Sequence, residues 1–319
     1  MSTSAGSSTL ERCGFWHEAW FYEGDDEFLD RAASFVDEGV RAREPVLVVV
    51  DRRKIKALRA AIGPGARGVA YADMEVVGHN PAHIIPAWRR FLSDHDSGAA
   101  VRGIGQPIYP ARAGAELVEC HVHEALLNRA FDDVTRDFWL LCPYDASALA
   151  PSVVDTARAT HPYVTDGDGP HERGCFDGHA CIDSALELPL PPVPSSAFVH
   201  PFSGGALADL RAAAAEFAAG AGLSPLRVDD FVLGIHEVAA NSICHGPGRG
   251  TLSLWSESDR LLAEVHDAGR IADPMVGRVE PSAVECSGRG LWIANQLFDL
   301  VQIRSTASGA VVRMHLLIR

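Results

Sequence analysis

A proline-rich segment near the middle of the chain limits the possible folds more than any other feature of the sequence. Residues 188–196 read LPLPPVPSS and hold four prolines in nine residues. Proline lacks an amide hydrogen and fixes its own φ angle, so this segment cannot lie inside a helix or a central strand. It favours an extended spacer. We therefore expect two folded units, which also suits a length of 319 residues.

The residues just before this spacer differ from the sequence on either side. Residues 166–183 (DGDGPHERGCFDGHACID) are rich in Gly, Asp and His and show no periodicity. Such a stretch is typical of a long surface loop. We therefore predict one domain over residues 14–165, a loop and Pro-rich linker over 166–196, and a second domain over 197–319.

Helix-like and strand-like segments alternate in the first unit. Residues 46–50 (VLVVV) and 138–142 (FWLLC) are short apolar runs of the kind that form buried parallel strands. Apolar residues at helical spacing predict helices over 28–42, 52–62, 81–94 and 113–131. This alternation predicts a doubly wound α/β domain.

In the second unit, helices come first and most strands follow. We predict helices over residues 207–219, 224–244 and 291–298. Ser224 and Pro225 suit the N-cap and the first position of the second helix, and the run Gly-Pro-Gly at 246–248 ends it. Strands are predicted over 250–257, 260–266, 300–305 and 309–318. This order predicts an α+β two-layer sandwich.

Two polar residues of the predicted helix 224–244 carry the first chemical signal. Glu237 and Asn241 lie four residues apart, so their side chains project from one helix face. A carboxylate can orient a hydroxyl group for attack on a phosphoryl group, and an amide oxygen can ligate Mg²⁺. A solvated helix surface also carries such pairs, so the pair alone leaves both interpretations open.

Two glycine-containing segments follow this helix. Asp267 and Gly269 come directly after the strand 260–266, where a carboxylate can accept a hydrogen bond from the amine of adenine; an ordinary turn is the alternative. Residues 287–291 (SGRGL) then open a helix, whose backbone N–H groups and positive end suit phosphates. The intervening stretch, 270–287, is long, contains glycine and suits a lid.

In this order the motifs resemble the GHKL ATPase superfamily, which includes gyrase, Hsp90, histidine kinases and MutL. EVAANSICHG, VHDAGRIADP and GRGLWIANQLFDLVQIRS are most similar to the anti-sigma-factor serine/threonine kinases. The resemblance covers roughly residues 195–319 and implies the GHKL (Bergerat) ATP-binding fold with ATP and Mg²⁺ as cofactors. It implies that Glu237 is the general base and Asn241 the Mg²⁺ ligand. It further implies nucleotide contacts from Asp267, Gly269, Gly288, Arg289, Gly290 and Leu291.

Two positions depart from the family pattern. Ile271 stands where a second glycine often follows, and Ala310 stands where a threonine often follows Gly309. We expect both changes to weaken nucleotide binding, while the groups needed for catalysis remain. No phospho-acceptor histidine helix precedes the module, which disfavours a histidine kinase.

The first unit lacks the GxxxxGK[ST] phosphate loop of a working P-loop NTPase. Residues 14–165 instead resemble the MEDS sensory family. This resemblance rests on HEAWFY (17–22), FVDEG (35–39), EPVLV (44–48), ECHVHEALLN (119–128), LCPYD (141–145) and HP (161–162). It implies a degenerate RecA/KaiC-like fold and a role in signal input, with no established ligand.

Histidines in the first unit and the linker raise the question of a metal. Pairs occur at 79/83 and 121/123, and the linker holds His171, Cys175, His179 and Cys181. The linker set has plausible ligand types, but its spacing matches no standard zinc pattern. We favour a polar loop without metal there. His17 and Tyr22 are predicted to be packing residues.

Charge and cysteine content restrict the partners and the compartment. The net charge of −14 argues against a nucleic-acid or anionic membrane surface. The sequence shows neither a signal peptide nor an apolar run of the roughly 18 residues that a membrane span needs. Seven scattered cysteines fit free thiols in a reducing compartment. We expect a cytoplasmic protein that contacts neither nucleic acid nor membrane directly.

Together the resemblances imply a signal-responsive anti-sigma factor that regulates transcription, as in a stress response. It would bind ATP–Mg²⁺, hold an alternative sigma factor, and phosphorylate Ser or Thr on a STAS-domain anti-anti-sigma protein; kinases of this type often form homodimers. The alternative is a nucleotide-gated binding module without phosphotransfer. A clamp-type ATPase is disfavoured, because such proteins usually append a transducer domain.

Overall fold

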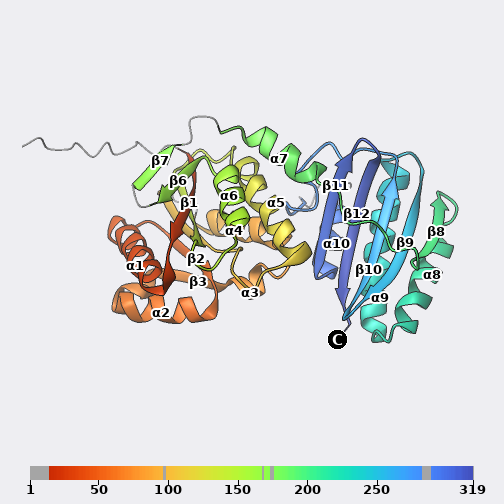
Figure 1. Ribbon diagram of the computed structural model, residues 1–319, viewed down its shortest axis with the longest axis horizontal. Helices are drawn as coiled ribbons and strands as arrows, with labels where there is room; N and C mark the ends of the chain where they lie inside the picture. Colours follow the sequence, from red (N-terminus) through yellow and green to blue (C-terminus); the bar gives the residue numbers. More distant parts are fainter. Residues whose placement is uncertain (1–13, 96–97, 167–168, 173–175, 282–288, 319) are drawn as a thin grey trace, which may run out of the picture.

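The computed structural model describes residues 14–95, 98–166, 169–172, 176–281 and 289–318. Within these residues the strands form two sheets, which belong to two lobes lying side by side (Figure 1). In this described part, no helix has the length and apolar character needed to cross a membrane.

The first lobe alternates strands and helices. Its strands are β1 (Phe15–Tyr22), β2 (Val46–Val50), β3 (Val69–Asp73), β4 (Val101–Gly105), β5 (Phe138–Asp145), β6 (Tyr163–Asp166) and β7 (Gly169–Glu172). Its helices are α1 (Gly24–Ala42), α2 (Arg52–Ile62), α3 (Met74–Val77), α4 (Ile84–Asp94), α5 (Gly114–Ala130) and α6 (Pro151–Thr160), with 3₁₀ turns at η1 (Gly63–Gly68) and η2 (Pro81–His83).

The sheet of the first lobe is mostly parallel. Its strand order is β3-β2-β4-β5-β1-β6-β7, and the β6–β7 pair is antiparallel. Apolar side chains cover both faces, with Trp20, Phe28 and Leu58 on the side of α1 and α2 and Trp88 and Leu126 on the side of α4 and α5. Coverage on both faces explains why every residue of β2 is apolar and buried. The predicted α/β fold with a parallel-rich sheet is confirmed.

The second lobe is a two-layer sandwich. Its strands are β8 (Phe198–Ser203), β9 (Arg249–Glu257), β10 (Arg260–Asp267), β11 (Leu300–Thr306) and β12 (Gly309–Leu317), in the antiparallel order β11-β12-β10-β9-β8. Helices α8 (Leu207–Gly220), α9 (Pro225–Cys244) and α10 (Arg289–Leu297) lie on one face of this sheet. This arrangement confirms the predicted α+β sandwich and fits a GHKL-type fold; the edge strand β8 was not predicted.

The prediction of an irregular surface loop over residues 166–183 was wrong. Strand β7 pairs with β6, and helix α7 (Gly178–Glu187) begins after Asp177, whose carboxylate accepts hydrogen bonds from the backbone N–H groups of His179 and Ala180. Helix α7 packs against α5 of the first lobe and β11 of the second (Figure 1). This segment is therefore part of the contact between the lobes.

The Pro-rich segment that follows α7 is fixed to the open face of the second sheet. The Nε atom of Arg304 donates a hydrogen bond to the carbonyl of Leu188 at 2.9 Å, and Arg313 donates to the carbonyl of Pro191 at 2.6 Å. Proline removes backbone donors but leaves the carbonyl groups free to accept. Arginine side chains of the sheet can therefore hold an extended segment that forms no regular structure.

Helix α5 is buried on two sides. Its buried residues are Glu119, Cys120, Val122, His123, Glu124, Ala125, Leu126, Leu127 and Ala130. Most of them face the sheet and helices of the first lobe, whereas the carboxylate of Glu119 contacts the second lobe. Helices with buried residues all round belong to the interior of a protein.

Candidate functional site

A cavity of about 250 Å³ lies in the second lobe between α9, the end of β10 and the segment that follows β10. Four residues that we predicted to contact nucleotide line it, namely Asn241, Asp267, Gly269 and Leu291. Valines of α9, β10 and β12 supply apolar wall. A mostly apolar cavity with a few polar groups is the usual form of a small-molecule site.

Asp267 is fixed at the end of β10 by the close approach of β12. It lies opposite Ala310 in the strand register, and its Oδ1 atom accepts a hydrogen bond from the backbone N–H of Gly269 at 2.6 Å. Gly309 has a φ angle of 131°, and a Cβ atom there would collide with the Asp267 carbonyl. Glycine is therefore required at 309 to place the Asp267 carboxylate beside the cavity.

The start of α10 packs directly on the face of α9 that carries the predicted polar pair. A Cβ atom on Gly290 would lie 2.8 Å from Nδ2 of Asn241 and 3.1 Å from the Glu237 carbonyl. Asn241 lines the cavity, whereas Glu237, half-buried one turn earlier, is not among its lining residues. Arg289 is the exposed first residue of α10, and Gly288 lies outside the described residues.

The polar groups on this cavity suit the ATP and Mg²⁺ that the fold implies. A carboxylate beside apolar walls can accept from the adenine amine, and an amide oxygen such as that of Asn241 is a ligand type that Mg²⁺ uses. The first turn of α10 lies next to this amide, and a helix N-terminus favours phosphate. The residues present therefore fit the nucleotide, although the roles assigned to them stay predictions.

The predicted lid, as far as the structure describes it, is held by the first lobe. Arg278 is 2 % exposed and donates a hydrogen bond to Oε2 of Glu119 at 3.0 Å. Met275 packs against the hydrophobic core of the first lobe. Within the second lobe, the amide of Asn295 donates to the carbonyl of Gly277 at 2.9 Å. This segment therefore borders the cavity and the first lobe at once.

Glu119 binds a second arginine through its other oxygen. Oε1 accepts hydrogen bonds from Arg304 at 2.6 Å and from Gln302 at 3.4 Å, and both partners lie on β11. Burial lowers the pKa of Arg278, while the charge of Glu119 opposes that shift. Because one buried carboxylate balances two buried guanidinium groups, its removal would leave both without a counter-charge.

The chain before α4 holds the far end of α10. The amide of Asn80 donates to the carbonyl and the side-chain oxygen of Asn295, each at 3.1 Å, and Nε2 of His83 donates to the same carbonyl at 2.7 Å. The His79 ring lies 3.0 Å from Oδ1 of Asp299. Sequence reasoning missed these contacts, because asparagine and histidine at such positions carry no pattern of their own.

The same contacts set the ionisation of Asp299. Burial by itself raises the pKa of this carboxyl group, but hydrogen bonds from His79 and the Leu317 backbone, with the charge of Arg227, lower it to about 2. Asp299 therefore carries its negative charge where α10 ends and the two lobes meet.

The predicted histidine sets are not brought together as metal sites. His79 and His83 serve the contact between the lobes. Among the residues that the structure describes, the pair 121/123 and the linker residues His171, His179 and Cys181 join no group of three metal-binding side chains, and Cys175 lies outside that part. His17 was predicted to be a packing residue, and it is fully buried and stacks on Phe15, but its ring nitrogens also contact Asn128 and Glu124.

Tyr22 was also predicted to be a packing residue. It is buried, but its hydroxyl oxygen accepts hydrogen bonds from Nζ of Lys54 at 2.8 Å and from the amide of Gln106 at 3.0 Å. Burial raises the pKa of Tyr22, so the hydroxyl stays protonated in the physiological range. Tyr22 therefore combines packing with a polar role.

Comparison with protein families assigns both lobes. Residues 16–162 match the MEDS domain, described as the methanogen/methylotroph, DcmR sensory domain. Residues 202–316 match the histidine kinase-like ATPase domain. No curated protein matches the chain. The predicted architecture, a MEDS sensory domain followed by a GHKL-type ATPase domain, is confirmed, and it fits a regulatory ATP-binding protein.

Proposed function

We propose that this chain is a signal-responsive anti-sigma regulatory factor that binds ATP–Mg²⁺, phosphorylates Ser or Thr on a STAS-domain antagonist and sequesters an alternative sigma factor. The observation that carries the nucleotide part is the position of Asn241, Asp267 and Leu291 on one cavity beside the start of α10. The phosphorylated residue type and the partners rest on the motif resemblance to anti-sigma kinases.

The proposed residue roles follow from the motif resemblance, and the positions of Asn241 and Asp267 on the cavity support theirs. When bound, ATP supplies the γ-phosphoryl group and Mg²⁺ neutralises its charge. Asn241 would hold the cation, Asp267 would accept from the adenine amine, and the backbone of residues 289–291 would face the phosphates. Glu237 takes the proton from the substrate hydroxyl as that oxygen attacks. Positioning and charge supply most of the catalysis.

The first lobe would act as the signal input. Its Glu119 holds Arg278 of the lid, and its Asn80 holds Asn295 of α10. A signal that moves these first-lobe residues would therefore move both elements that border the nucleotide. We further propose that this lobe has a degenerate RecA/KaiC-like origin, which its mostly parallel sheet supports, and that the two domains span residues 14–165 and 197–319.

A phosphotransfer assay tests the proposed activity. The full chain is incubated with ATP labelled at the γ-phosphate and with candidate STAS proteins, as wild type, Glu237→Ala and the control Asp229→Ala on an exposed turn of the same helix. We expect transfer by wild type and control, and at least ~100-fold less by Glu237→Ala, because loss of a general base costs that much. ATP affinity should be similar in all three. If wild type binds ATP yet transfers nothing, the kinase proposal fails.

A second candidate is a nucleotide-gated binding regulator without phosphotransfer. It is favoured by the absence of Glu237 from the described cavity lining, and by Ile271 and Ala310 on the cavity wall. Capture of partners from native cells with and without ATP separates the two. In the second candidate, Glu237→Ala would keep ATP-dependent capture of the sigma factor, and no phosphorylated antagonist would appear.

A further inference from the structure

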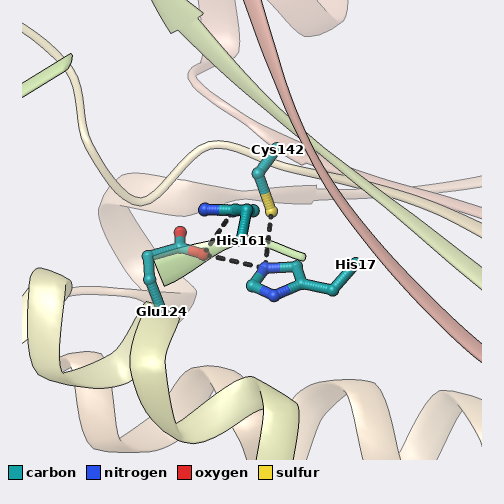
Figure 2. A group of neighbouring side chains, drawn as sticks. All are labelled: His17, Glu124, Cys142 and His161. Carbon is teal, nitrogen blue, oxygen red and sulfur yellow. Dashed lines mark hydrogen bonds and ion pairs between the residues drawn. The ribbon is translucent and has the colours of Figure 1, made fainter. Parts of the chain in front are cut away.

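Four buried side chains converge in a cluster within the first lobe, whereas the proposed nucleotide cavity lies in the second lobe. They are His17 of β1, Glu124 of α5, Cys142 of β5 and His161, which follows α6, and they point toward one another (Figure 2). Their potential ligand atoms all lie within 4.8 Å of one another. Each of the four residues is at most 1 % exposed.

The hydrogen bonds of the two histidines aim lone pairs into this cluster. The amide nitrogen of Asn128 donates to the carbonyl of Thr160 at 2.8 Å, so its Oδ1 atom accepts from Nδ1 of His17 at 3.0 Å. Nδ1 of His161 donates to the carbonyl of Ala157 at 2.8 Å. With the hydrogen on Nδ1, each neutral ring presents the lone pair of Nε2 to the centre.

At the centre of the cluster, the Nε2 lone pairs of the two histidines therefore face the carboxylate oxygens of Glu124, and both kinds of atom are hydrogen-bond acceptors. Oε2 of Glu124 lies 3.1 Å from Nε2 of His17 and 3.2 Å from Nε2 of His161. Oε1 of Glu124 and Nε2 of His161 have no hydrogen-bond partner among the residues described. The thiol of Cys142, with Sγ 3.5 Å from Nε2 of His17, and the buried hydroxyl of Tyr144 beside Glu124 can supply one proton each, fewer than the lone pairs present. Buried lone pairs without donors are costly, and a cation at the centre would satisfy all of them together.

We propose that His17, Glu124, Cys142 and His161 bind a zinc ion. Two imidazoles, one thiolate and one carboxylate form a ligand set that zinc uses, whereas Mg²⁺ and Ca²⁺ prefer oxygen alone. Tetrahedral zinc with bonds of about 2.0–2.3 Å places its ligand atoms about 3.3–3.6 Å apart. The separations of 3.1, 3.2 and 3.5 Å lie close to that range.

Charge balance supports an ion at this fully buried position. One carboxylate and one thiolate carry two negative charges, which equal the charge of Zn²⁺, so the loaded site is neutral. The thiol proton of Cys142 leaves to solvent as the zinc–sulfur bond forms, and nothing is oxidised or reduced. Four protein ligands complete a tetrahedral shell, which is the form of a structural zinc site. The ion would join β1, β5, α5 and the end of α6.

Metal analysis of the full chain tests this proposal without reference to kinase activity. Protein purified from zinc-supplemented cells, without chelator, is examined for metal content as wild type, Cys142→Ser and Glu124→Gln. Cys120→Ser is the matched control, because Cys120 is equally buried on α5 but its thiol contacts the Pro107 carbonyl instead. We expect about one zinc per chain in wild type and control. The ligand variants should lose more than about 100-fold in zinc affinity, since even changes to residues that only hydrogen-bond a metal ligand cost about 10–100-fold.

Cobalt substitution keeps the test decisive if a ligand variant fails to fold. Wild type stripped of metal and titrated with Co²⁺ should show the thiolate-to-cobalt charge-transfer absorption and the strong visible bands of tetrahedral cobalt. Wild type that holds no zinc and shows no such bands would overturn the proposal, and the cluster would then share a proton instead. Equal zinc content in Cys142→Ser and Cys120→Ser would overturn it as well.

Discussion

The carboxylate of Glu119 in the sensory lobe and the guanidinium of Arg278 in the ATPase lobe form a buried ion pair, with 3.0 Å between Oε2 and Nη2. Arg278 lies two residues after Val276, which lines the proposed nucleotide cavity. The position of the lid therefore depends on a residue that lies about 160 positions earlier in the chain. Four predictions follow from this contact and from the cavity beside it.

Replacing Glu119 should weaken the contact between the lobes. Glu119→Gln leaves Arg278 and Arg304 buried without their counter-charge, so we expect a loss of about 3–5 kcal/mol in unfolding free energy. Backbone amides of residues 271–280 should also exchange hydrogen faster. Denaturant unfolding and hydrogen exchange measure the two effects.

The control for this change is Glu116→Gln on the same helix. The Glu116 carboxylate lies 3.8 Å from Arg260, and both side chains are about one-third exposed. Such a pair contributes at most about 1 kcal/mol. If Glu119→Gln and Glu116→Gln lose the same stability, the Glu119 ion pairs do not hold the lobes together.

Asp267→Asn tests the adenine contact. We expect ATP affinity to fall by about 10–100-fold, because a hydrogen bond to a charged acceptor contributes about 1.5–3 kcal/mol. Titration calorimetry measures the dissociation constant, and Asp259→Asn, in the exposed turn between β9 and β10, is the control. An unchanged dissociation constant for Asp267→Asn would remove Asp267 from the nucleotide site.

Gly290→Ala tests the close packing of α10 on α9. The added Cβ atom would press on Asn241, so we expect a loss of about 1–3 kcal/mol in stability together with weaker ATP binding. Gly220→Ala at the end of α8 is the control, because a Cβ atom there meets nothing within 4 Å. That control should be neutral or stabilising by up to about 1 kcal/mol. Thermal unfolding with and without ATP distinguishes the two variants.

Asp299 predicts a specific loss of stability in acid. Its pKa is about 2 in the folded chain, against about 3.9 in an unfolded one. The charged form therefore stabilises the folded state by about 2 kcal/mol above pH ~4, and this contribution disappears as the pH falls toward 2. Asp299→Asn should lack this part of the pH dependence, whereas Asp259→Asn should keep it. Urea unfolding between pH 2 and 6 measures the slopes; parallel slopes for wild type and Asp299→Asn would contradict the prediction.

Local pattern predicted most of the regular structure. The run 46–50 and the helix 52–62 were predicted with the bounds that the structure shows, because the run is wholly apolar and the helix has apolar residues at helical spacing. Strand β8 was missed because Pro201 lies within it, a residue that only an edge strand tolerates. Helix α7 was missed because several glycines precede it and the Pro-rich segment follows it, although Asp177 is a good N-cap.

The two candidate sites differ in how far sequence could predict them. Asn241 and Asp267 could be predicted to share one site because their motifs occur in a recognisable order along the chain. Asn241 lies on a predicted helix, and Asp267 comes directly after a predicted strand. The ligands of the proposed zinc site lie on four separate elements spread over residues 17–161. They meet only because β1 and β5 pair in register and α5 packs across them. No local spacing encodes that meeting, although each ligand falls in a segment of the MEDS resemblance.

Helix α5 connects the proposed zinc site with the contact between the two lobes, which has a consequence for signalling. Glu124 and Glu119 lie five residues apart on it, which is about 7.5 Å along the axis. Because both residues belong to one continuous helix, a movement of the helix at Glu124 also displaces Glu119. Binding or loss of a ligand at Glu124 would therefore also move Glu119 and its partner Arg278, which lies beside the proposed nucleotide cavity.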